Sequence, residues 1–171
     1  MANIIVDGYN VIGIFHKDME KARMDFVNLL VNYKKIRNHD ITVVFDGYKN
    51  GALTEKISVI GGVRVIFTRL GITADDLIKK IISEDKREWI VVSDDRDIAS
   101  YAWSKNSIPI SSEIFFEITS IKVRNLTDNK SYKMDNIDLV EDEDLRHTNI
   151  KGKPFRPSKK KRAIRKALSK L

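Results

Sequence analysis

Four short apolar runs, each closely followed by an aspartate, constrain the fold of this 171-residue chain more than any other feature. Helical patterns separate the runs, and this alternation predicts an α/β fold, in which a mostly parallel sheet of about five strands carries helices on both faces. In such a sheet the carboxyl ends of the strands share one edge, where ligands bind. The aspartates are Asp7, Asp46, Asp75 and Asp95, after the runs 4–6, 42–45, 63–67 and 89–92.

The remaining elements follow from periodicity and capping signals. Apolar residues recur at three- and four-residue steps from 19 to 36, which predicts an amphipathic helix. Thr73 is expected to cap the next helix, with Asp76 completing a capping box. Residues 108–110 predict a fifth strand, at an edge because it contains a proline. We expect a loop over 47–62 and a hairpin with strands at 121–123 and 132–134.

Carboxylates gathered at one edge repel each other unless a cation joins them, so the pattern predicts a site for Mg²⁺ or Mn²⁺. Such ions activate water for attack on a phosphodiester. Singly, each aspartate has an alternative role as a turn or helix-cap residue. We expect Asp94 to cap its helix and Asp95 to point inward. The candidate ligands are Asp7, Asp75, Asp95 and Asp97, with Asp46, Asp76 and Asp94 as secondary candidates.

Composition excludes several classes of protein. The chain has no cysteine, which rules out a disulfide framework, a thiolate zinc site and a cysteine nucleophile, and its three histidines are scattered. No apolar run approaches the roughly 20 residues needed to cross a bilayer. The first residues lack the features of a signal peptide. We therefore expect a cytoplasmic protein without membrane association.

The net charge of +7 is unevenly distributed. Residues 148–171 hold ten of the 31 Lys and Arg residues and none of the 24 acids, which leaves the first 147 residues with a net charge of −3. Basic segments of this kind favour polyanions such as RNA, although a solubilising or membrane-surface role is the alternative. The segment could form a short basic helix that is disordered until it meets a partner.

Residues 4–12 resemble the opening motif of the NYN-domain ribonucleases, in particular their YacP-like branch. Three further segments are similar to motifs of that branch and follow in the same order. They are residues 44–47, residues 67–69 with the helix start at 73–78, and residues 91–98. The spaced pair Asp95 and Asp97 is also similar to the wider NYN group. The resemblance covers about residues 3–118 and not the basic segment.

The resemblance implies a PIN-like, three-layer, Rossmann-like fold and a metal-dependent endoribonuclease. The implied site consists of Asp7, Asp75, Asp95 and Asp97, with Asn10 nearby to orient Asp7, and the implied substrate is single-stranded RNA, either free or on the ribosome. The loop 69–72 lacks the acid that the branch leads us to expect before Thr73, so we expect one firmly bound ion and a second only with substrate.

Several basic and hydroxyl residues are candidates for RNA contacts, although a solvated surface charge is the alternative for the arginines. Tyr9 could stack on a base or cover the core. The candidates are Arg23, Arg69, Thr73, Ser93, Lys159, Lys160, Lys161, Arg162, Arg165 and Lys166.

Two other functions compete with the nuclease. A non-catalytic RNA- or ribosome-binding module would use mainly the basic segment, and a metal-dependent phosphatase or DNA nuclease would use the same carboxylates. A phosphoaspartyl phosphatase usually needs a second aspartate two residues after the first, where this chain has Tyr9.

We expect a monomer or weak dimer, with a nuclease domain over 1–120, an extension over 121–147 and a basic tail over 148–171. The acidic stretch 138–144 could fold back on that tail.

Overall fold

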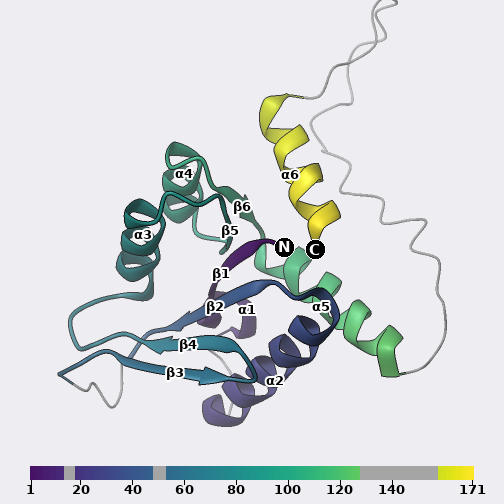
Figure 1. The fold of residues 1–171 in the computed structure, drawn as a ribbon. Helices are drawn as coiled ribbons and strands as arrows, with labels where there is room; N and C mark the ends of the chain where they lie inside the picture. Colours follow the sequence, from purple (N-terminus) through teal and green to yellow (C-terminus); the bar gives the residue numbers. More distant parts are fainter. Residues whose placement is uncertain (14–17, 48–52, 128–157) are drawn as a thin grey trace, which may run out of the picture.

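The computed structural model describes residues 1–13, 18–47, 53–127 and 158–171. Six strands form one sheet in the order β3-β4-β2-β1-β5-β6, and all neighbours are parallel except β3 and β4 (Figure 1). This arrangement confirms the predicted α/β fold. The strands are β1 (Asn3–Asp7), β2 (Asp40–Phe45), β3 (Lys56–Ile60), β4 (Val63–Phe67), β5 (Trp89–Val92) and β6 (Ile108–Ile110).

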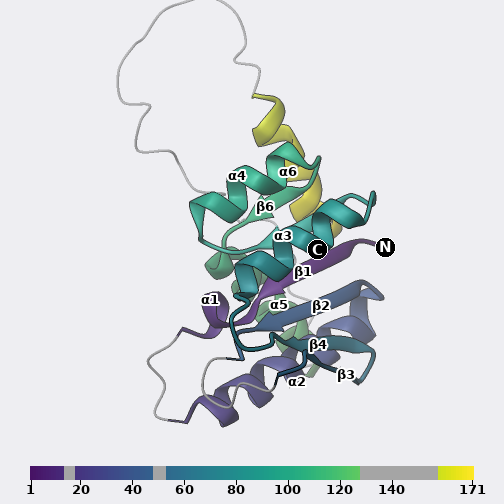
Figure 2. The same ribbon diagram turned by 90° about the vertical axis from the view of Figure 1, so that its left-hand side faces the viewer.

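Helices cover both faces of the sheet (Figures 1 and 2). One face packs against α2, α5 and α6 in a core that includes Val6, Leu30 and Phe115. The other face packs against α3 and α4 around Ile5, Ile78 and Ile98. Alternate residues of β1 therefore enter opposite cores, as expected for a central strand. The helices are α1 (Gly8–Ile12), α2 (Met19–Arg37), α3 (Ala74–Glu84), α4 (Arg96–Ser104), α5 (Ser112–Thr127) and α6 (Lys159–Lys170).

One strand of the sheet was not predicted from the sequence. Within the predicted loop at 47–62, residues Lys56–Ile60 form β3, which pairs antiparallel with β4 at the edge of the sheet. Gly61 and Gly62 connect the two strands with φ values of 54° and 84°. Two glycines between strands favour a tight hairpin, because L-residues with side chains seldom adopt these angles. The Gly-Gly pair was therefore the available signal.

The predicted strand at residues 121–123 is wrong, because these residues belong to α5. Phe115, Ile118 and Thr119 are buried at helical spacing along this element, so a helix buries its apolar face better than a strand would. The boundary expected at residue 120 falls inside the same helix. The predicted second hairpin strand and the acidic stretch 138–144 lie outside the described residues.

The end of the basic segment is a docked helix and not a free tail. Ser158 caps α6, and Ala167 and Leu171 are buried in the core on the α2 side of the sheet. Tyr33 Oη and Arg37 Nε, both on α2, donate hydrogen bonds of 2.7 and 3.1 Å to the main-chain oxygen of Leu171. These contacts fix the helix on the body of the domain.

The docked helix lies away from the carboxyl edge of the sheet. Lys170 pairs at 2.8 Å with Glu88, which directly precedes β5, and Lys160 lies over the ring of Trp103 in the last turn of α4. Both partners lie at the opposite end of their elements from the aspartates. The basic side chains of α6 therefore do not line the predicted site. Within the described parts of the chain, no helix is both long and apolar enough to cross a membrane.

Candidate active site

Asp7 is the anchor of the carboxylate edge. It is the last residue of β1, a strand with neighbours on both sides, and only 5% of its surface is exposed. Its carboxylate caps α1 by accepting the Asn10 main-chain N–H at 3.2 Å, and Asn10 Nδ2 donates to the other oxygen at 3.3 Å. The predicted contact between Asn10 and Asp7 is confirmed. Residues Gly8–Asn10 form the start of this short helix.

Asn10 also connects Asp7 to the other side of the edge. Its Oδ1 accepts the main-chain N–H of Asp94 at 2.9 Å and the hydroxyl of Ser112 at 3.4 Å. One amide side chain thus joins the end of β1, the loop after β5 and the start of α5. This network holds the orientation of Asp7 without a positively charged partner.

The charge on Asp7 is unfavourable in the folded protein. Its pKa is raised from 3.8 to about 6, chiefly by burial and also by the negative charges of Asp75 and Asp46, while the Asn10 hydrogen bonds act in the opposite direction. The packing of a buried strand does not require a charged group at its end. The free-energy cost of ionising Asp7 in the folded protein therefore indicates a functional role.

Asp46 places α3 beside this carboxylate. Its Oδ1 accepts the main-chain N–H of Ala74, the first residue of α3, at 2.6 Å. Asp75, the next residue, is half-buried, and its pKa is raised by burial and by the charges of Asp95, Asp46 and Asp76, while Lys79 acts in the opposite direction. The structure therefore groups four of the predicted aspartates electrostatically: Asp7, Asp46, Asp75 and Asp95.

The cap of α4 was assigned one residue too early. Asp95 is the N-cap, and its Oδ1 accepts the main-chain N–H groups of Asp97 and Ile98 at 2.6 and 3.1 Å. Asp94 instead accepts the N–H of Ser112 at 2.9 Å and so holds the start of α5. The prediction that Asp94 caps α4 is wrong, because α5, which lies elsewhere in the sequence, takes the carboxylate of Asp94.

Asp97 lies outside the carboxylate group that surrounds Asp7. Its side chain is 79% exposed and pairs with Lys79 Nζ, which links α4 to α3. Lys79 was not predicted as part of the site, although its position four residues after Asp75 on a helix was an available signal for pairing. The ammonium group interacts with Asp75, Asp95 and Asp97.

The predicted RNA contacts fall into four groups. Thr73 and Asp76 form the predicted capping box of α3, and Ser93 accepts the Asp95 main-chain N–H at 3.2 Å, so these side chains support local structure. Arg69 is exposed in the loop before α3. Arg23 is half-buried and donates to the Tyr9 hydroxyl at 2.8 Å, which differs from the solvated charge considered for it. The basic residues of α6 lie elsewhere on the domain.

The comparisons with known proteins identify the family. A model of the YacP-like NYN domain matches residues 4–151, most of the chain. This protein belongs to the YacP-like NYN domain family. Crystal structures of Rae1 (YacP) from Bacillus subtilis and of a mutant of it share the fold, at TM-scores of 0.62 and 0.61 and identities of 24% and 22%. Each alignment covers 75% of this chain, and it covers 79% of the Rae1 chain and 80% of the mutant chain. No curated protein matches the sequence.

NYN-domain proteins are typically nucleases, and nucleases of this kind typically use divalent metal ions. In this NYN domain the donor atoms at the edge suit such ions, because they are carboxylate oxygens whose charges repel one another. Within the described residues, no three acidic or histidine side chains are close enough together to form a complete ligand set. The residues therefore suit an ion such as Mg²⁺ or Mn²⁺ that is bound directly by only one or two carboxylates. Water would complete the coordination, since Mg²⁺ commonly retains several water molecules.

The raised pKa of Asp7 predicts how the metal-free NYN domain responds to pH. The folded protein keeps its proton up to about pH 6 whereas the unfolded chain loses it near 3.8, so ionisation of Asp7 lowers stability as the pH rises between these values. Urea unfolding in EDTA should show Asp7→Asn gaining stability relative to wild type across this window, by at most about 3 kcal/mol. A difference that stays constant with pH would contradict the burial argument.

Proposed function

We propose that this protein is a metal-dependent endoribonuclease that cleaves single-stranded RNA. The observation that supports this most is the group of carboxylates at the carboxyl edge of the sheet. Within this group Asp7 is buried, and burial together with the charges of Asp75 and Asp46 raises its pKa. Such an arrangement lowers the stability of the folded protein. A positively charged ligand would remove this cost, because it neutralises the repulsion between the carboxylates.

Asp7 and Asp75 would hold the ion, with Asp95 on the opposite side of the edge. When bound, Mg²⁺ or Mn²⁺ would supply an activated water and neutralise charge on the phosphate. Asn10 fixes the orientation of the Asp7 carboxylate through two hydrogen bonds, and Asp46 positions Asp75 by holding the first N–H of α3. Lys79 interacts with Asp75 and Asp95 and would supply a donor for a phosphate oxygen.

The basic helix α6 supports a role in RNA binding apart from catalysis. Because it is docked away from the carboxylates, it would hold RNA at a second surface, and this binding should weaken strongly with salt. We propose a cytoplasmic monomer or weak dimer that acts on free or ribosome-bound RNA.

The test is cleavage of a labelled, mixed-sequence single-stranded RNA with Mn²⁺ or Mg²⁺ and with EDTA. We expect cutting only with metal, and a loss of at least about 100-fold in Asp95→Asn, because even indirect disturbance of a metal site costs 10- to 100-fold. Asparagine is also a good N-cap, so α4 should persist in this variant.

The matched control is Asp25→Asn, an exposed aspartate on α2, which should cut like wild type. Cutting that is indifferent to EDTA and to Asp95→Asn would refute the proposed site. RNA binding without any cutting would instead support the non-catalytic binding module.

A further inference from the structure

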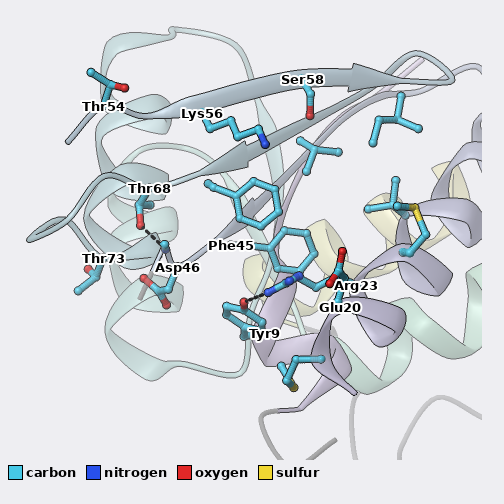
Figure 3. A pocket seen from close by; sticks show the side chains of 17 residues that line it. Tyr9, Glu20, Arg23, Phe45, Asp46, Thr54, Lys56, Ser58, Thr68 and Thr73 are labelled. Carbon is cyan, nitrogen blue, oxygen red and sulfur yellow. Dashed lines mark hydrogen bonds between the residues drawn. The ribbon is translucent and has the colours of Figure 1, made fainter. Parts of the chain in front are cut away.

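A groove leads away from the carboxylate edge, between α2 and the strands that α2 covers (Figure 3). Its volume is about 1040 Å³, at the upper end of the roughly 300–1000 Å³ of typical small-molecule sites. Residues of α2 form one wall, and β2, β3 and β4 form the other. Tyr9 and Asp46 also line the groove, so it opens directly beside the candidate active site.

Flat side chains are layered inside this groove. The rings of Phe45 and Phe67 stack with centroids 5.4 Å apart and planes 22° apart, and Tyr9 meets Phe45 edge-on at 5.2 Å. The Arg23 guanidinium lies 5.6 Å from the centroid of Phe67. Its hydrogen bond to the Tyr9 hydroxyl, drawn in Figure 3, holds it in this position. Arg23 is half-exposed, so it presents a flat, cationic outer layer.

The charges around the groove do not select an anion. Arg23 lies close to Glu20 at one end, and Lys56 and Asp46 both contribute to the lining, so positive and negative groups occur in equal number (Figure 3). Most of the remaining wall is aromatic or aliphatic. Thr54 and Ser58, together with Lys56, provide polar groups on the β3 side. A flat ligand with polar edges and no net charge fits these walls better than a phosphate does.

We propose that this groove binds the bases of a single-stranded nucleic acid next to the phosphate that lies at the carboxylates. The inference rests on the proposed function for the location of that phosphate. Stacking on Arg23, which the aromatic rings support from behind, accepts every base, because each base has a flat π-face. The bases of a duplex are paired and stacked on each other, so the groove selects an unpaired strand.

The experiment measures binding in EDTA, where cleavage plays no part. A short RNA that carries 2-aminopurine is compared with the same RNA lacking bases at the corresponding positions. We expect wild type to quench the fluorescence and to bind the intact RNA about tenfold more tightly than the abasic RNA. This ratio should fall towards one in Arg23→Leu, which loses the planar outer layer, and in Ser58→Trp, which fills the groove from β3.

Arg64→Leu is the matched control, because Arg64 is exposed on β4 and does not line the groove. It removes the same charge and should keep the wild-type ratio, and thermal melting checks that each variant folds.

Equal affinity of wild type for intact and abasic RNA would overturn the inference, as would a ratio that survives both groove substitutions. If wild type discriminates bases but cuts no RNA with Mn²⁺, the proposed nuclease activity is refuted and base binding in the groove is supported. If it cuts RNA without discriminating bases, only base binding in the groove is refuted.

Discussion

Asp7→Asn should lose at least about 100-fold in RNA cleavage and yet unfold at no lower urea concentration than wild type. Asparagine has nearly the same shape, and its side-chain oxygen can still accept the Asn10 main-chain N–H that caps α1. The variant loses the hydrogen bond from Asn10 Nδ2, because an amide nitrogen cannot accept it, but it also loses a negative charge that burial and the charges of Asp75 and Asp46 disfavour, and this second effect is the larger. Activity and stability should therefore change in opposite directions.

The role of metal in this result is tested by thermal melting. Mn²⁺ binds the folded protein and should raise the melting temperature of wild type in proportion to the logarithm of its concentration. In Asp7→Asn this increase should be much smaller, because the anchor ligand is neutral. If both proteins respond alike to Mn²⁺, or if Asp7→Asn cuts RNA normally, Asp7 is a cap of α1 and not a metal ligand.

Gly8→Ala should be strongly destabilising, lowering the free energy of unfolding by about 3 kcal/mol. A Cβ at this position would lie 2.1 Å from Cε1 and 2.4 Å from Cδ1 of Phe45. The Phe45 ring cannot withdraw easily, because it is fully buried and packs against Tyr9 and Phe67. The clash must therefore displace the start of α1, and Asp7 with it.

Gly13→Ala is the comparison for this variant. A Cβ at Gly13 would meet nothing within 4 Å, although its φ of +72° disfavours alanine. We expect a cost of about 1–2 kcal/mol there, from backbone strain alone. Urea unfolding of the two variants measures the difference, and cleavage assays should show a larger loss for Gly8→Ala. Equal stability of the two variants would mean that Phe45 moves aside without cost.

Much of the fold could be predicted because its signals are local. The apolar runs have the length of buried strands, and the helix over 19–37 carries its own period. The strand β3 was missed because its side chains are largely exposed at an edge, where burial imposes no apolar pattern. Residues 121–123 were assigned to a strand because so short an apolar run fits either element, and only packing against the body selects the helix.

The local pattern of apolar runs and aspartates was enough to predict five of the six strands, the edge at which the parallel strands end and the acidic character of that edge. What each carboxylate does there depends on contacts between elements that are distant in the sequence. Asp94 holds α5 while Asp95 caps α4, and Asp97 is turned to the surface by Lys79. The docking of α6 on Tyr33 and the aromatic groove beside Asp46 are also tertiary results. The physical reason is that these partners come from separate elements, so no local pattern of residues specifies which of them meet.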